Sequence, residues 1–95
     1  MATTITQSEN PELNEIVLRI EGDMLLDDAM LLEKIAVGIQ AETAGTIVLD
    51  MADLDFLDSD SAAVLKRLSD EYGFIIRGME IFLQTAINNA ERAAN

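Results

Sequence analysis

The stretch Thr46-Ile47-Val48-Leu49-Asp50-Met51-Ala52-Asp53-Leu54-Asp55-Phe56-Leu57-Asp58-Ser59-Asp60 decides the fold. Its first four residues form an uninterrupted apolar or β-branched run, which is typical of a parallel strand covered on both faces. A short acidic loop follows this run, and a helical pattern begins near Ser59. The first N–H groups of a helix are unpaired and lie in a positive dipole potential, so a strand, a loop and a helix N-terminus together make a site. We therefore expect an interior strand at Thr46–Leu49 and a functional site at the start of the following helix.

Strand and helix patterns alternate on either side of this stretch. Before this stretch we expect an edge strand at Thr3–Gln7 with a turn at Asn10-Pro11-Glu12, a strand at Ile16–Ile20 and a helix from Asp27 to Ile39 capped by Asp27. The strand at Thr46–Leu49 is followed by a helix at Ser59–Tyr72 capped by Asp58. After a connector between Gly73 and Gly78 we expect a strand at Met79–Leu83 and a final helix from Ala86 to Ala93. Residues 1–12 would hold the edge strand and turn, and residues 86–95 the short C-terminal helix. The order β-β-α-β-α-β-α over residues 1–95 predicts a single α/β domain, with a mixed β-sheet and helices packed against it.

Composition excludes several classes of function. The chain has 95 residues, with no histidine and no cysteine, which removes Ser-His-Asp catalysis, thiolate chemistry and disulfides. We therefore expect no enzyme, no cofactor and no metal site. Eighteen acidic residues against six basic ones give a net charge of −12, which repels nucleic acid and anionic lipid and favours a protein partner. The chain starts without a signal-peptide pattern and its apolar runs are too short to insert into a membrane, so we expect a soluble cytoplasmic domain.

The acidic loop and the helix after it hold the candidate site residues. Asp58 is expected to cap the helix, and Asp60 in the first turn is favourable with the helix dipole. Ser59 and Ser61 are read either as capping or packing hydroxyls or as phosphorylated residues. Those two interpretations stay open.

A cation site is the other interpretation of this acidic loop. Asp50, Asp53, Asp55 and Asp58 offer hard oxygen ligands, which Ca²⁺ and Mg²⁺ prefer. Their spacing matches no EF-hand loop, so the interpretation has little support.

From Ile47 to Ser59 the chain resembles STAS domains, the family of anti-sigma-factor antagonists. Asp50 matches the aspartate that ends the family's strand, and Asp58-Ser59 matches its Asp-Ser step. Leu54, Phe56 and Leu57 match the apolar spacer positions. The resemblance covers roughly Glu15 to Arg92, although outside the central motif it rests mainly on apolar pattern.

The resemblance implies a bacterial regulatory module of signal transduction and transcription regulation. Its partner would be a serine kinase that acts as an anti-sigma factor, a phosphatase or a larger signalling assembly. Switchable members carry Asp-Ser-Ser-Gly or Asp-Ser-Thr-Gly, and a kinase phosphorylates the second hydroxyl residue. In this chain Asp60 stands at that position and Ser61 at the glycine. Aspartate has about half the charge of a phosphate, so the site is either fixed in a partly phosphate-like state or phosphorylated at Ser59 or Ser61.

The resemblance also implies which residues contact the partner. They are Asp55, Asp58, Ser59, Asp60 and Ser61, in the loop and the first helical turn.

Three alternatives remain beside the anti-sigma-factor-antagonist interpretation. Within the same family, the chain would be an accessory subunit of a lipid-transport ABC system and bind its ATPase. From another class, an acyl carrier protein is small and acidic with an attachment serine at a helix start, but it is a helical bundle. A receiver domain would use Asp50 as its phosphoacceptor, but the chain lacks the family's other acidic residues and lysine. Self-association stays open in each case.

Overall fold

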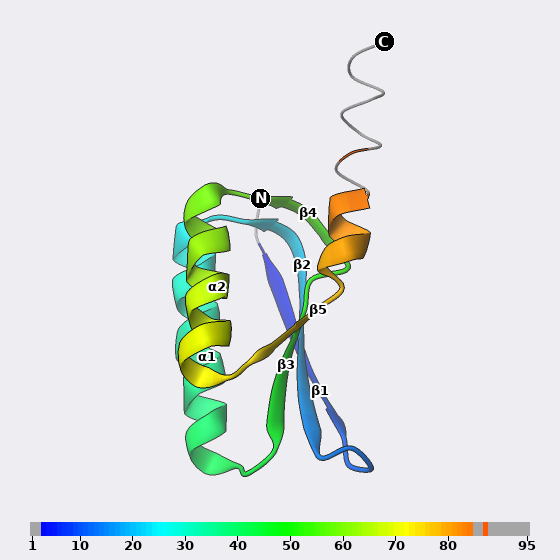
Figure 1. Cartoon of the computed structure of the whole chain (residues 1–95), viewed down its shortest axis with the longest axis vertical. Helices are drawn as coiled ribbons and strands as arrows, with labels where there is room; N and C mark the ends of the chain where they lie inside the picture. Colours follow the sequence, from blue (N-terminus) through cyan, green and yellow to red (C-terminus); the bar gives the residue numbers. More distant parts are fainter. Residues whose placement is uncertain (1–2, 85–86, 88–95) are drawn as a thin grey trace.

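The computed structural model describes residues 3–84 and residue 87. Its elements are β1 (Thr4–Asn10), β2 (Glu15–Met24), α1 (Leu26–Glu42), β3 (Thr46–Asp50), β4 (Leu54–Leu57), α2 (Ser59–Tyr72) and β5 (Ile75–Arg77). Residues 79–84 are helical and follow β5 (Figure 1). The expected α/β class and order of elements are confirmed, and the acyl-carrier alternative, which requires a helical bundle, is wrong.

The strands form a mixed sheet in the order β1-β2-β3-β5, and β4 pairs with the end of β2. β1 is antiparallel to β2, whereas β3, β4 and β5 are all paired in parallel. β3 therefore lies inside the sheet, between β2 and β5. Ile47 and Val48 are 2% and 0% exposed, which confirms the interior strand expected at this position.

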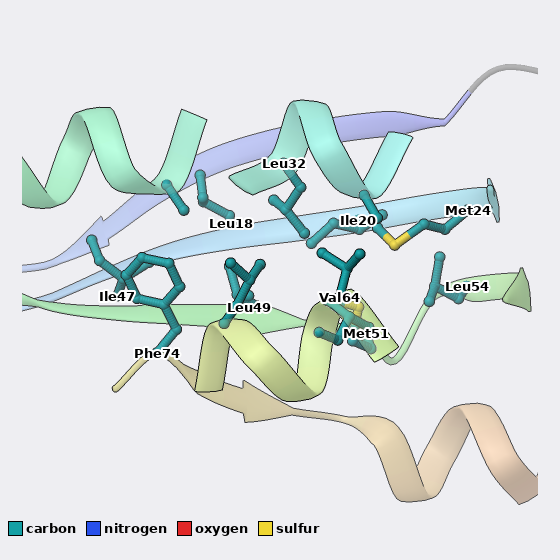
Figure 2. Packing of buried hydrophobic residues seen from close by; sticks show 14 of the residues in the cluster. Leu18, Ile20, Met24, Leu32, Ile47, Leu49, Met51, Leu54, Val64 and Phe74 are labelled. Atoms are coloured by element: carbon teal, nitrogen blue, oxygen red, sulfur yellow. The ribbon is translucent and has the colours of Figure 1, made fainter. Parts of the chain in front are cut away.

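The core lies between the sheet and the two long helices. α1 and α2 stand side by side over one face of the sheet (Figure 1). Figure 2 shows side chains of the two helices meeting those of the sheet. The main contributors to this core are Leu18 and Ile20 of β2, Ile47 and Leu49 of β3, Ala29, Leu32 and Ala36 of α1, and Val64, Leu65 and Leu68 of α2. Apolar residues at spacings of three and four on each helix bring this stripe to the sheet.

The opposite face of the sheet carries neither α1 nor α2, yet Val48 on that face is fully buried. Val48 is the register partner of Val17 on one side and Ile75 on the other, so the three side chains form an apolar row. Arg77 Nη2 donates to Glu15 Oε2 at 3.3 Å, which joins the outer strand β5 to β2 across β3. By register, this ion pair crosses the apolar row on the face where Val48 lies.

The expected strand at Met79–Leu83 is wrong, because residues 79–84 are helical. The strand is β5, which lies in the segment that we expected to be a connector. It pairs with the end of β3, and Gly78 ends it with a φ of 83°. The Phe82 N–H then donates to the Gly78 carbonyl at 3.2 Å, and Phe82 packs into the core from this turn.

Other element boundaries differ less. β1 is an edge strand and is longer than expected. α1 begins at Leu26, and its cap position is Leu25 rather than the expected Asp27. The Leu25 N–H donates to Asp28 Oδ2 at 3.0 Å, which fixes this position. β4 lies inside the segment that was expected to be loop. The expected C-terminal helix lies outside the described residues, apart from Ile87, which is helical.

Gly78 and Gly73 both have positive φ, but only Gly78 is crowded. A Cβ at Gly78 would lie 2.7 Å from the Ala52 nitrogen, whereas a Cβ at Gly73 would meet nothing within 4 Å. Gly73→Ala should lower the free energy of unfolding by about 1 kcal/mol, the cost of a left-handed backbone. Gly78→Ala should cost distinctly more, because the backbone at Ala52 must also move away from the new Cβ. Urea unfolding of both variants tests this, and equal losses would contradict the close approach.

Candidate functional site

The candidate site lies at one end of the sheet, where β2 and β4 end and both α1 and α2 begin (Figure 1). β4 places it there, because Phe56 and Leu57 pair with Asp23 and Met24 at the end of β2. The chain then passes directly into α2, so the start of this helix lies beside the turn into α1. Asp58, the residue between β4 and α2, is at the centre of this junction.

Asp58 holds the junction together. Its backbone N–H donates to the Met24 carbonyl at 3.3 Å, and its Oδ1 accepts from the Ser61 N–H at 2.7 Å. The pKa of Asp58 lies below its ordinary value because the Ser61 hydroxyl and the Ser61 N–H stabilise the carboxylate, and the Leu26 N–H adds to this. The Asp58 carboxylate therefore caps the first turn of α2, as expected from the sequence.

Ser61 faces inward. Its side chain is 0% exposed, and its Oγ donates to the Met24 carbonyl at 3.3 Å. This is the position at which the resembling family carries glycine. The hydroxyl links α2 to the end of β2 and is not exposed to solvent.

Ser59 and Asp60 face outward on the first turn of α2, and both are exposed. Asp55 is exposed on β4, and the neighbouring Phe56 is 49% exposed. The structure thus divides the five expected contact residues into two groups. Asp55, Ser59 and Asp60 are open to a partner, whereas Asp58 is half-buried and Ser61 is buried.

Among the residues that the structure describes, no basic side chain neutralises the carboxylates of Asp55 and Asp60 at this end. The ion pairs of the described residues join Arg19 to Glu21 and Asp53, Lys66 to Asp70, Arg67 to Glu33 and Glu71, and Arg77 to Glu15. None of these pairs includes Asp55 or Asp60. A partner with basic side chains would therefore meet free carboxylates.

The acidic loop is not arranged around a common centre. Asp50 Oδ1 accepts from the Ala52 N–H at 3.0 Å, and Asp53 lies 3.2 Å from the Arg19 guanidinium. Between residues 3 and 84, no three acidic side chains gather closely enough to hold a metal ion. In the same part of the chain, no helix is both long enough and apolar enough to cross a membrane.

Exposed apolar side chains next to the site were not anticipated from the sequence. Leu25 and Leu26 are 50% and 39% exposed at the start of α1, and Phe56 stands on the outer side of β4. The sequence assigned Phe56 to an apolar spacer in a loop. Its exposure depends on the pairing of β4 with β2, for which the four-residue segment carries no clear pattern.

Comparisons with known proteins agree with this architecture. The family model described as STAS domain matches residues 4–87. A solved structure, the crystal structure of an antisigma-factor antagonist STAS domain from Rhodobacter sphaeroides, has the same fold, with a TM-score of 0.63 and 18% sequence identity over 87% of this chain and 94% of that chain. Among curated proteins, none matches the chain in sequence.

The Asp58 cap on α2 predicts how acid affects stability. Because the pKa of Asp58 is lower in the folded state, its contribution is complete above the ordinary aspartate pKa and is lost as the pH falls through the lowered value. Asp58→Asn should therefore be destabilising at pH 7, and the difference from wild type should shrink as the pH falls towards 3. Urea unfolding at a series of pH values measures this. Asp55→Asn, which removes a carboxylate from β4 that caps no helix, is the matched control, and an identical pH profile for both variants would contradict the cap.

Proposed function

The chain belongs to the STAS domain family, and on that premise we propose that it is a regulatory protein–protein interaction module of the kind represented by anti-sigma-factor antagonists. It acts by binding and not by turnover. Its partner is a protein kinase that serves as an anti-sigma factor, a phosphatase or a larger signalling assembly. The contact surface is the loop before α2 together with the first turn of that helix.

The observation that supports this proposal is the division of the first turn of α2 into an inner and an outer side. Asp58 and Ser61 fix the turn to the end of β2 through the Met24 carbonyl. Ser59 and Asp60 are exposed on the same turn. A rigid backbone that presents a hydroxyl and a carboxylate to solvent suits recognition, because little conformational entropy is lost on binding.

Charge at Asp60 then selects the partner. A carboxylate at this position is a fixed negative charge where the resembling family adds and removes a phosphate. Like charges across an interface cost several kcal/mol, whereas a cationic partner group is attracted. We propose that Asp60 keeps the domain in one binding state, and that any further switching falls on Ser59.

Exposure distinguishes the two candidate phosphorylated serines. We expect a cognate serine kinase to modify Ser59 and to leave Ser61 unmodified, because Ser61 is fully buried. Intact-protein and peptide mass spectrometry after incubation with the kinase would show one phosphate, lost in Ser59→Ala and retained in Ser61→Ala. Phosphate on Ser61 of the folded protein would rule out this assignment.

The role of Asp60 is tested with the partner itself, identified by pull-down from the native lysate and mass spectrometry. Asp60→Ser, if unphosphorylated, should strengthen binding to a kinase-type partner by about tenfold to a hundredfold, because a like charge is removed from a desolvated contact. Asp60→Asn keeps the shape and removes the charge, so it should shift the affinity in the same direction. Titration calorimetry measures both. Values within twofold of wild type for both variants would reduce Asp60 to a first-turn residue.

A further inference from the structure

The outer side of β1 is an open strand edge. β1 pairs with β2 along all of its seven residues without a shift, and in the described part of the chain no strand pairs with its other side. Its start is held too, since the Thr3 hydroxyl donates to the Asp23 carbonyl at 2.6 Å. In an antiparallel pair, every second residue of an edge strand directs its N–H and C=O groups away from the partner. β1 therefore presents a regular row of unpaired backbone donors and acceptors.

The sequence of β1 does little to protect this edge. Proteins usually protect an edge strand by making it short or by adding lysine, proline or a bulge. At the opposite edge of the sheet, β5 has only three residues. β1 has seven residues, Thr-Ile-Thr-Gln-Ser-Glu-Asn, with Glu9 as its one charged residue and without lysine, proline or a bulge. The longer of these two edges is therefore the one that is open to another strand.

An apolar side chain of α1 lies beside this edge. α1 contacts β2 and β3 whereas α2 contacts β5, so α1 lies nearer to β1 (Figure 2). Glu33 of α1 is bonded to Arg67 of α2, and Leu31 and Ile35 point the opposite way round the helix, towards the β1 side. Ile35 and Ile5 of β1 both pack against the core, but Leu31 is 51% exposed. An exposed leucine thus borders the open edge.

β1 is complementary to a second copy of itself. In an antiparallel pair centred on Gln7, all seven residues of each strand have a partner. The pairs are Gln7 with Gln7, Thr6 with Ser8, Ile5 with Glu9 and Thr4 with Asn10. Hydroxyl and amide side chains meet in most of these pairs, and polar contacts of this kind stabilise neighbouring strands. The two Glu9 residues lie four positions apart, about 13 Å along the strands, which exceeds the screening length of about 8 Å at physiological salt.

The antiparallel orientation also separates the acidic ends of the two copies. Thr4 pairs with Glu21, so β1 begins near the end of the sheet that carries the candidate site. Asp55 and Asp60 are exposed at that end. When two β1 strands run in opposite directions, the site ends point away from each other, which limits repulsion between two chains of net charge −12. A parallel arrangement would place these ends side by side.

We propose that β1 pairs with β1 of a second copy, antiparallel and centred on Gln7, so that two domains share one continuous sheet. Leu31 of each copy lies on the helix side of the junction. The two-fold pairing closes the assembly at two copies, because the long open edge of each chain is then used. The Ser59–Asp60 turns stay free at opposite ends, so the dimer can bind two partner molecules at once. The β1 edge is separate from the proposed partner-binding surface.

A charge exchange at Gln7 tests the register. In Gln7→Lys and in Gln7→Glu, two like charges face each other across the two-fold axis, so each variant alone should dimerise at least about tenfold more weakly than wild type. An equimolar mixture of the two variants should restore pairing as a heterodimer, because lysine then meets glutamate. Analytical ultracentrifugation at up to about 1 mM protein, which reaches weak affinities, measures dimerisation. Native mass spectrometry identifies the heterodimer.

Ala63→Lys is the matched control, because it makes the same change in net charge at an exposed position on α2, away from β1. It should dimerise within twofold of wild type. Gln7 is exposed, so both of its variants should keep the circular-dichroism spectrum of wild type. A wild type that is monomeric at about 1 mM, or a mixture without heterodimer, would overturn the proposal. Dimers that tolerate either charge at Gln7 but are lost in Leu31→Gln would also overturn it, and would assign self-association to α1. Asp60 variants test the other surface, so failure here leaves that proposal intact.

Discussion

The hydrogen bonds around Asp58 and the Met24 carbonyl determine how the functional end of the domain is arranged. Asp58 accepts from the first turn of α2, and its own N–H donates to Met24 at the end of β2. The Ser61 hydroxyl donates to the same carbonyl from inside the helix. These bonds pair a donor of the α2 N-terminus and hold the helix to the end of β2, while Ser59 and Asp60 on its outer side are exposed.

Elements whose residues carry their own signal were predictable from the sequence. The bounds of α2 follow from an aspartate cap, apolar residues at spacings of three and four, and Gly73 in the left-handed conformation at its end. β3 follows from its unbroken apolar run. β5 has only three residues, and its identity depends on pairing with β3. The segment after it is mostly apolar, like a buried strand, but forms a helical turn, because Gly78 ends the strand and Phe82 reaches the core from that turn.

The candidate site was predicted in position but not in detail. The strand–loop–helix order located the first turn of α2, and the role of Asp58 as a cap follows from its residue type. Which serine faces inward was not predictable, because Ser59 and Ser61 are both ordinary residues for a first turn. Their difference comes from the Met24 carbonyl, which only the pairing of β2 with β4 brings near. The exposure of Phe56 depends on the same pairing.

The ion pair between Arg77 and Glu15 has a consequence for colloidal behaviour. By strand register it crosses the apolar row of Val17, Val48 and Ile75 on a sheet face that has neither α1 nor α2 above it. The ion pair has a free-energy cost, since Glu15 Oε1 is buried without a hydrogen-bond partner among the described residues. Without this ion pair, the apolar row would run uninterrupted to the edge strand β5. Exposed apolar edge strands promote aggregation of sheets. Charged side chains beside an edge strand are one way in which sheets avoid pairing with other sheets, so Arg77 and Glu15 are placed to limit such pairing as well as to join β5 to β2.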